Sequence, residues 1–250
     1  MIFHVLESGS KGNCTVVQSD EQFLIIDCGG TKTYLKECFS DLGIDYRKAE
    51  ALLVTHDHSD HIKQIKMFDM LNIYAPSEIL GTSNETVIRP LEVFNIGKFT
   101  VMPIPLSHDS PHTVGYIIYD GSETLVSVTD TGYISHNNEK LIAGADYYIF
   151  ESNHDVTMLM NSQRPDYLKD RILSNNGHLC NEDSAAVLSH IIRENTREIV
   201  LAHISEECNT PSLAYNTLID TLNRRGVDYS NCRINVARQY APYTGGNKHD

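Results

Sequence analysis

Short runs of apolar, β-branched residues recur along the whole 250-residue chain. Each run has the length of a strand and is bounded by Gly, Asp, Asn or Pro, a pattern that predicts a β-strand. The expected strands are Ile2–Leu6, Cys14–Gln18, Phe23–Asp27, Ala51–Thr55, Phe99–Leu106, Val114–Tyr119, Thr124–Thr129, Tyr147–Glu151, Ile199–His203 and Arg233–Ala237.

Four segments between these strands repeat apolar residues at helical spacing. They are Thr33–Leu42, His61–Leu71, Asn181–Glu194 (with Asn181 as the expected N-cap) and Leu213–Leu222. The first half of the chain is rich in strands, and the second half alternates strand and helix. This order predicts an α/β protein whose mixed sheets are covered by helices. We expect one domain over residues 1–250, ending in a flexible tail of about eight residues.

Histidine and acidic residues cluster at the ends of five of the expected strands. They are His56, His108, Asp130, Glu151 and His203. In layered α/β proteins the loops beyond strand ends converge, and ligands bind there. We therefore expect these side chains to meet in one site.

Composition narrows the class of protein. With 41% hydrophobic residues the chain can bury a core without disulfides, and no apolar run reaches the roughly 18–20 residues that span a bilayer. The six cysteines form no CxxC pair and no secretion signal is evident, so we expect reduced thiols and a cytoplasmic protein. The net charge of −13 argues against a broad basic face for nucleic acid, although a nucleic acid could still bind in a cleft.

The densest chemical signal is Thr55-His56-Asp57-His58-Ser59-Asp60-His61, which joins a strand to a helix. At such a turn His56 and His58 can point at one ion while Asp60 and His61 point at a second. Imidazole and carboxylate groups are ligands of Zn²⁺, Mn²⁺ and Fe. A solvated, His-rich turn is the alternative, but burying this cluster without a cation would be costly.

This string is the HxHxDH signature of the metallo-β-lactamase superfamily, and other segments resemble that family in the same order. His108 in PLSHD matches the family's third His, Asp130 in SVTDTGY its bridging Asp, and His203 in LAHIS its last His. The resemblance implies a four-layer αβ/βα sandwich that holds two divalent metal ions. The implied first set of ligands is His56, His58, His108 and Asp130, and the second is Asp60, His61, Asp130 and His203.

Taken singly, some of these residues have plainer explanations. His108 could be a loop residue, Asp130 a turn residue, and His203 a core histidine at a strand end. Asp57 lies between ligands, and we expect it to orient a ligand imidazole. Two ions about 3.5–4 Å apart would activate a water molecule, so the expected chemistry is hydrolysis by a metal-bound hydroxide.

His178 points to the kind of hydrolysis. It precedes the expected helix Asn181–Glu194, whose free N–H groups form a ready phosphate site, and an imidazole there could protonate a leaving alkoxide. The stretch resembles the corresponding His of phosphodiesterase members such as RNase Z and PhnP. We therefore expect His178, Asp60 and Asp130 to be the catalytic residues; an exposed loop histidine is the alternative for His178.

Nearly the whole chain, roughly residues 1–240, resembles the YycJ (WalJ) group of bacterial exonucleases. The matching blocks are LESGSKGNCTVV, ESNHD, GHLCNED and LAHISEECNTP, with Lys11, Cys180 and Cys208 as departures from that group's small residues. Asn153 and His154 in the second block could support the site or contact a strand, or form a capped polar loop. Ser10 and Asn13 in the first could cradle a phosphate, or form a hairpin turn.

The expected function is therefore a di-metal 5′→3′ exodeoxyribonuclease that uses Zn²⁺ or Mn²⁺, with Fe as a further candidate ion. Its expected substrate is single-stranded or 5′-end DNA, with no membrane partner. One alternative is a hydrolase of a cyclic phosphodiester, thioester or lactone. Another is a non-enzymatic, metal-loaded scaffold, against which the intact ligand set argues.

Overall fold

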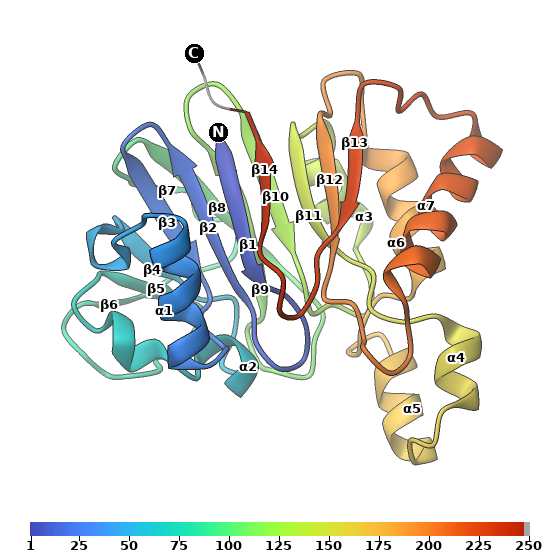
Figure 1. Ribbon diagram of the computed structural model, residues 1–250, viewed down its shortest axis with the longest axis horizontal. Helices are drawn as coiled ribbons and strands as arrows, with labels where there is room; N and C mark the ends of the chain where they lie inside the picture. Colours follow the sequence, from blue (N-terminus) through green and yellow to red (C-terminus); the bar gives the residue numbers. More distant parts are fainter. Residues whose placement is uncertain (248–250) are drawn as a thin grey trace.

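Two seven-stranded sheets face one another in the computed structural model, which describes residues 1–247 (Figure 1). Sheet A has the order β14-β1-β2-β3-β4-β5-β6, and sheet B has the order β13-β12-β11-β10-β9-β8-β7. The strands of sheet A are β1 (Ile2–Glu7), β2 (Cys14–Ser19), β3 (Gln22–Ile26), β4 (Ala51–Leu53), β5 (Ile73–Ala75), β6 (Glu85–Val87) and β14 (Tyr243–Gly246). Those of sheet B are β7 (Phe94–Ile96), β8 (Phe99–Pro105), β9 (Val114–Tyr119), β10 (Thr124–Val128), β11 (Tyr147–Glu151), β12 (Glu198–Ala202) and β13 (Arg233–Val236).

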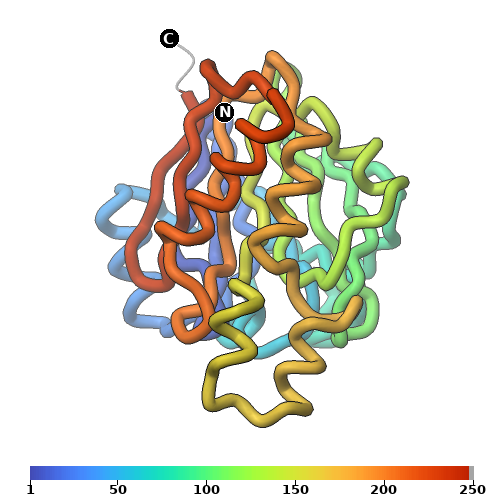
Figure 2. Tube along the Cα trace, turned by 90° about the vertical axis from the view of Figure 1, so that its right-hand side faces the viewer, coloured from blue at the N-terminus to red at the C-terminus, as the bar shows by residue number. Residues whose placement is uncertain are grey.

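The helices lie outside the two sheets. They are α1 (Lys32–Asp41), α2 (Ser59–Ile62), α3 (His136–Ile142), α4 (Val156–Asn161), α5 (Asp166–Leu173), α6 (Asn181–Ile191) and α7 (Pro211–Arg225), with the 3₁₀ turns η1 (Tyr46–Lys48) and η2 (Ile65–Phe68). Figure 1 shows α1 on the outer side of sheet A, and α6 and α7 on the outer side of sheet B. In Figure 2 the α4–α5 hairpin extends beyond the rest of the molecule.

Three hydrophobic clusters hold these layers together. The first lies between the sheets and joins Phe3 of β1 to Tyr147 of β11. The second packs the outer face of sheet A against α1 through Leu35, and the third packs sheet B against α6 and α7 through Leu188 and Leu218. The expected four-layer αβ/βα sandwich is thereby confirmed.

Strand direction explains why the polar strand ends gather. In sheet A, β1 and β3 run the same way because each is antiparallel to β2, and β4 is parallel to β3. In sheet B, β10, β11 and β12 are parallel, and β8 shares their direction because both β8 and β10 are antiparallel to β9. Within each sheet the carboxyl ends of these strands therefore open at one edge, where the loops carry the site.

All ten predicted strands are present, but the helix expected over His61–Leu71 is wrong. It divides into α2 and η2, because the His61 carbonyl accepts a hydrogen bond from Cys28 N (2.7 Å) and Gln64 N donates to the Cys28 carbonyl (2.9 Å). The loop around Cys28 thus forms hydrogen bonds with backbone groups that a continuous helix would pair internally. The backbones are so close that a Cβ on Gly29 would lie 1.4 Å from the Asp60 carbonyl oxygen.

Two smaller expectations are also corrected. The N-cap of α6 is Cys180, whose Sγ accepts from Asp183 N at 3.4 Å, because the buried Asn181 side chain bonds Ser152 and Asn209 instead. The flexible tail does not begin about eight residues from the end: Tyr243–Gly246 form β14, paired with β1. Residues 248–250 lie outside the described part of the chain.

Candidate metal centre

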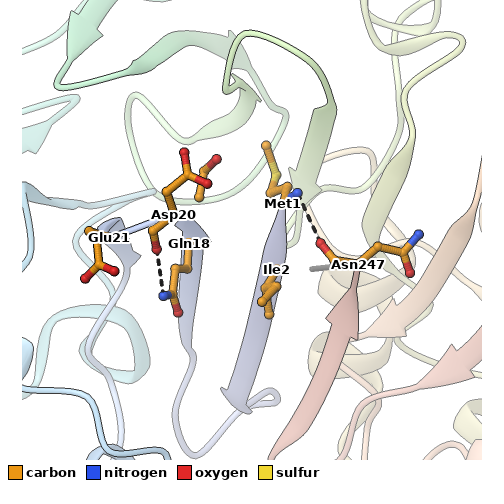
Figure 3. A pocket seen from close by; sticks show the side chains of 7 residues that line it. Met1, Ile2, Gln18, Asp20, Glu21 and Asn247 are labelled. Atoms are coloured by element: carbon orange, nitrogen blue, oxygen red, sulfur yellow. Dashed lines mark hydrogen bonds between the residues drawn. The ribbon is translucent and has the colours of Figure 1, made fainter. Parts of the chain in front are cut away.

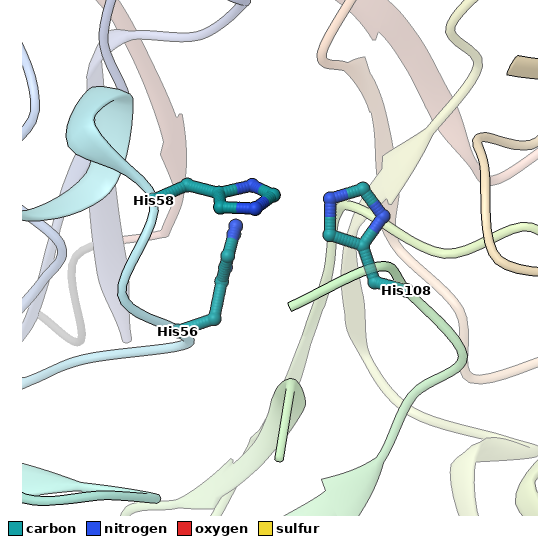
Figure 4. Close-up of side chains that lie close together, drawn as sticks. All are labelled: His56, His58 and His108. Atoms are coloured by element: carbon teal, nitrogen blue, oxygen red, sulfur yellow. The ribbon is translucent and has the colours of Figure 1, made fainter. Parts of the chain in front are cut away.

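The seven residues expected to bind metal lie at the shared edge of the two sheets. Three of them, His56, His58 and His108, offer nitrogen atoms within 4.8 Å of one another, and Figure 4 shows their rings turned towards a common point. His56 and His58 come from the loop between β4 and α2, and His108 comes from the loop after β8. Segments about 50 residues apart along the chain therefore supply one three-nitrogen set.

A second set lies beside the first and shares Asp130 with it. Asp60, His61 and His203 offer ligand atoms equally close together, and so do His56, His61 and Asp130. Asp130 Oδ2 is 3.2 Å from His61 Nε2, and Asp130 Oδ1 is 3.4 Å from His203 Nε2 and 4.0 Å from His108 Nε2. Asp130 thus lies between both sets of histidines, where a bridging ligand belongs.

Hydrogen bonds at the Nδ1 atoms turn the ligand rings inward. Carboxylates and carbonyls only accept, so each Nδ1 must donate and each Nε2 is turned towards the site, where that of His61 also lies 3.0 Å from Asn13 Nδ2. The acceptors are Asp27 Oδ2 for His61 (2.7 Å), the Gly177 carbonyl for His108 (3.0 Å) and Glu151 Oε1 for His203 (3.1 Å). The Thr55 hydroxyl donates to Asp27 at 2.8 Å and so accepts from His56 Nδ1 at 3.0 Å.

The donor set fits a divalent cation. Among the described residues, the buried atoms His56 Nε2 and His203 Nε2 have no hydrogen-bond partner, a costly arrangement unless an ion takes that place. Burial lowers the pKa of His56 far below its usual value. Burial also opposes a charge on His203, but Asp130, Asp60 and Glu151 outweigh it and raise its pKa to about 10. The carboxylates therefore hold positive charge here even without an ion.

Backbone conformation helps to aim these side chains. Asp27, Asp130 and His203 have φ values of 60°, 60° and 55°, in the left-handed region that residues other than glycine seldom occupy. Each comes directly after, or within two residues of, the last residue of a strand. The sharp turn directs each side chain back across the sheet edge into the site.

His178 stands at the edge of the metal centre. Its Nδ1 donates to Glu151 Oε1 at 2.8 Å, its ring stacks on that of His203 with centroids 5.2 Å apart, and it lines the cavity. Glu151 is fully buried, and its other oxygen accepts from Thr131 N (2.9 Å) and Leu179 N (3.3 Å). Burial would raise the pKa of Glu151, but His178 and His203 overcome this and lower it to about 2.

The remaining expected site residues have different placements. Asn13 lies 3.0 Å from His61 Nε2 and ties its own loop through Gly9, and Asn153 donates to the His203 carbonyl at 2.9 Å. Ser10 and Asn153 line the cavity. Asp57 accepts from Ser110 at 2.6 Å, and no bond from it to a ligand imidazole is found among the described residues.

His154 does not reach the cleft either: it is buried, away from the cavity lining, and neither ring nitrogen has a partner in the described chain. Of the residues that orient the ligands, Glu151 was expected at the site from its place at a strand end, whereas Asp27 and Thr55 had no such role in the sequence prediction. Asp27 ends a strand as Asp130 and Glu151 follow theirs, so the same pattern of an acid after an apolar run could have identified it.

The metal centre opens into a cavity of about 210 Å³. One wall carries His58, Asp60, His108, Asp130, His178 and His203, and the other is built by Arg164, Leu168, Arg171 and Ile172 of the α4–α5 hairpin. Another cavity, of about 270 Å³, surrounds Met1, Gln18 and Asp20 (Figure 3). It contains no histidine, so its chemistry is unlike that of the metal centre.

Comparisons with known proteins show the family of the chain. A family model described as "Beta-lactamase superfamily domain" matches residues 24–204. The chain is 34% identical over 238 residues to a Bacillus anthracis protein named exodeoxyribonuclease YycJ, covering 90% of each chain. It is 29% identical over 246 residues to a Streptococcus pneumoniae protein named exodeoxyribonuclease WalJ, covering 91% of each.

Solved structures show the same fold at lower identity. The metallo-beta-lactamase fold protein YhfI from Bacillus subtilis superposes with a TM-score of 0.72 at 17% sequence identity, covering 97% of this chain and 99% of that one. Among the described residues, no helix has both the length and the apolar character needed to cross a membrane.

Proposed function

The chain belongs to the beta-lactamase superfamily, and we propose that it is a metal-dependent exodeoxyribonuclease that degrades DNA from the 5′ end. The observation that carries the proposal is the pair Glu151–His178 beside the shared ligand set. Hydrolysis of a phosphodiester expels an alkoxide, which needs a proton, whereas a thioester or an activated lactone needs this help less. The names of the two bacterial relatives support the choice of DNA.

Two divalent ions, Zn²⁺ or Mn²⁺ with Fe as a further candidate, would be held by the two sets of ligands. His56, His58 and His108 would hold one, Asp60, His61 and His203 the other, and Asp130 would contribute to both. Bound there, such ions supply an activated water molecule and neutralise charge on the phosphoryl group. Which metal the cell provides depends on availability as well as on the ligands.

The protein's own groups perform the remaining work. Glu151 accepts the hydrogen bond from Nδ1–H of His178 and so fixes the orientation of the ring. The Nε2 atom is therefore the one that can carry a proton towards the leaving oxygen. Asn13 contacts the His61 ring, and Asn153 donates to the His203 carbonyl. A cavity of about 210 Å³ suits the end of a single strand better than the interior of a duplex. The six unpaired cysteines support a cytoplasmic location.

A direct test uses the purified, metal-loaded protein and a single-stranded DNA of defined length. Strands labelled at the 5′ or the 3′ end and carrying a 5′ phosphate are incubated with Mn²⁺ or Zn²⁺. Release of mononucleotides from the 5′ end, abolished in His58→Ala and Asp130→Ala, is the expected result. Absence of cleavage with every metal, or cleavage unchanged in both variants, would overturn the proposal. Preference for a thioester or a lactone in parallel assays would reassign the site to small molecules.

A further inference from the structure

Three exposed ion pairs surround the mouth of the metal centre. Lys11 Nζ lies 2.5 Å from Glu206 Oε2, Arg164 Nε lies 2.9 Å from Glu207 Oε2, and Arg171 Nε pairs with Asp109. We call these six residues the rim. The rim joins the loop after β1, the loop after β12, the α4–α5 hairpin and the loop after β8, which are the segments that build the site.

The rim cations are close to where a substrate must pass. Arg164 and Arg171 line the metal cavity itself. Glu206 lines a neighbouring cavity of about 490 Å³, which shares Ser205 with the metal cavity and also contains Arg238. The Lys11–Glu206 pair therefore lies where the two cavities meet, and a chain longer than one nucleotide would cross it.

Glu206 and Glu207 are exchangeable partners, whereas Asp109 also lies 3.5 Å from His58 Nε2 and 3.3 Å from His108 Nε2 and would give up only its bond to Arg171. Exposed ion pairs contribute little to stability, because water screens them and long side chains lose freedom when they pair. At least one side chain of each pair is about half exposed. A phosphate offers an arginine two oxygens in the geometry that its guanidinium matches, at similar charge. A strand can therefore replace the carboxylates without the cost of breaking a buried pair.

This inference rests on the proposed function. We infer that the rim cations, Lys11, Arg164 and Arg171, bind the backbone phosphates of a single DNA strand. In the absence of DNA the rim acids, Glu206, Glu207 and Asp109, pair with these cations, and the strand displaces the acids when it binds. This explains how a chain of net charge −13 binds a polyanion. The cations are concentrated at the mouth, and the acids beside them keep binding weak and dependent on salt, since each phosphate contact releases counterions.

The test compares both members of one pair. KM and kcat for 5′-phosphorylated single-stranded DNA are measured against salt for the metal-loaded wild type, Arg164→Gln and Glu207→Gln. Arg164→Gln should raise KM roughly tenfold and reduce the slope of log KM against log salt by about 0.7. Glu207→Gln, which frees Arg164, should lower KM several-fold with kcat unchanged. If the pair were merely structural, both variants would shift KM in the same direction.

Controls separate this inference from the proposed function. Arg89 and Glu92 form an exposed pair that lines none of these cavities, so Arg89→Gln and Glu92→Gln should leave KM unchanged. Hydrolysis of bis(p-nitrophenyl) phosphate, which has no strand, should be the same in Arg89→Gln and Glu92→Gln as in the wild type. Fluorescence anisotropy measures the binding of two hydrolysis-resistant phosphorothioate strands, one of DNA and one of RNA.

The outcomes are distinct. If Arg164→Gln weakened DNA binding and Glu207→Gln strengthened it, but no DNA was cleaved, the exodeoxyribonuclease proposal would be overturned and the rim inference would stand. Cleavage of DNA with no opposite shifts in KM or in binding would overturn the rim inference alone. Opposite shifts that appear only with the RNA strand would overturn the assignment of the rim to DNA.

Discussion

The Glu151 carboxylate accepts a 2.8 Å hydrogen bond from Nδ1 of His178, a residue 27 positions away that lines the metal cavity. The same oxygen accepts from Nδ1 of His203 at 3.1 Å. One buried acid thus orients both a metal ligand and the candidate proton donor. A change at Glu151 should therefore affect metal binding and proton transfer together.

Glu151→Gln should lower activity and metal affinity by about 10- to 100-fold, because an amide can satisfy only part of what the carboxylate accepts. The measurement is kcat for DNA with saturating metal, together with metal content after dialysis. Glu198→Gln is the matched control: Glu198 is a buried acid at the start of the neighbouring strand β12, bonded to Arg233 and Tyr243. That control should lose stability and keep kcat; equal losses of kcat in both variants would contradict the role of Glu151.

His178→Ala should reduce kcat for DNA by about 10²- to 10⁴-fold while metal content stays unchanged, because the leaving alkoxide loses its proton donor. The loss should be much smaller with a p-nitrophenyl phosphodiester, whose leaving group departs without protonation. The two substrates are compared at the same metal concentration. An equal loss on both would assign His178 to metal binding instead.

Metal loading should stabilise the fold and release protons. At 100 times its Kd an ion adds about 2.7 kcal/mol to the free energy of unfolding, and Asp130→Asn should lose most of that gain. The pKa of His203 is raised to about 10 and that of His61 lies well above its usual value, so protons compete with the ions below pH 10. Metal affinity should therefore rise with pH over this range. Calorimetry in buffers of different ionisation enthalpy measures the protons released; none released would contradict the charge assigned to these rings.

His154 should make the protein sensitive to acid. Burial lowers its pKa to about 4, below the unfolded value of 6.5. Above pH 6.5 the His154 imidazole is neutral in both the folded and the unfolded state, so it does not make the free energy of unfolding depend on pH. Between pH 6.5 and about pH 4 only the unfolded state takes up the proton, so the free energy of unfolding falls as the pH falls. Relative to His154→Leu, the metal-loaded wild type should lose up to about 1.4 kcal/mol per pH unit in that window. Parallel stability curves for the two proteins would show that His154 is protonated when folded.

Much of the fold could be predicted because local pattern and global architecture agree. The ten predicted strands lie within visible apolar runs, β4 with its three residues included, and the ligands follow them closely, as His203 follows β12. The missed elements are short: β5, β6 and β7 have three residues each and β14 has four, and α3, α4 and α5 have seven, six and eight, too few for a periodicity to be clear. The undivided helix over 61–71 was wrong because Cys28, far away in sequence, takes its hydrogen bonds.

The parts of the site that could not be predicted are those defined only by tertiary contact. Asp57 lies inside the motif but faces Ser110, while Asp27, 34 residues before His61, supplies the carboxylate that its ring needs. Arg164 and Arg171 have no distinguishing neighbours in the sequence. They reach the site because the α4–α5 hairpin folds over the cavity, and no local pattern encodes that approach.

The left-handed backbone at Asp27, Asp130 and His203 has a consequence for directed evolution. Each such residue costs of order 1 kcal/mol that a glycine there would not cost. A library of the metal-loaded protein selected only for heat resistance should nevertheless exclude glycine at these three positions. Loss of Asp130 or His203 weakens binding of an ion that stabilises the fold by more than the strain costs, and loss of Asp27 leaves Thr55 and His61 without their buried partner. Strained positions that such a selection leaves unchanged would then outline the active centre without any substrate having been chosen.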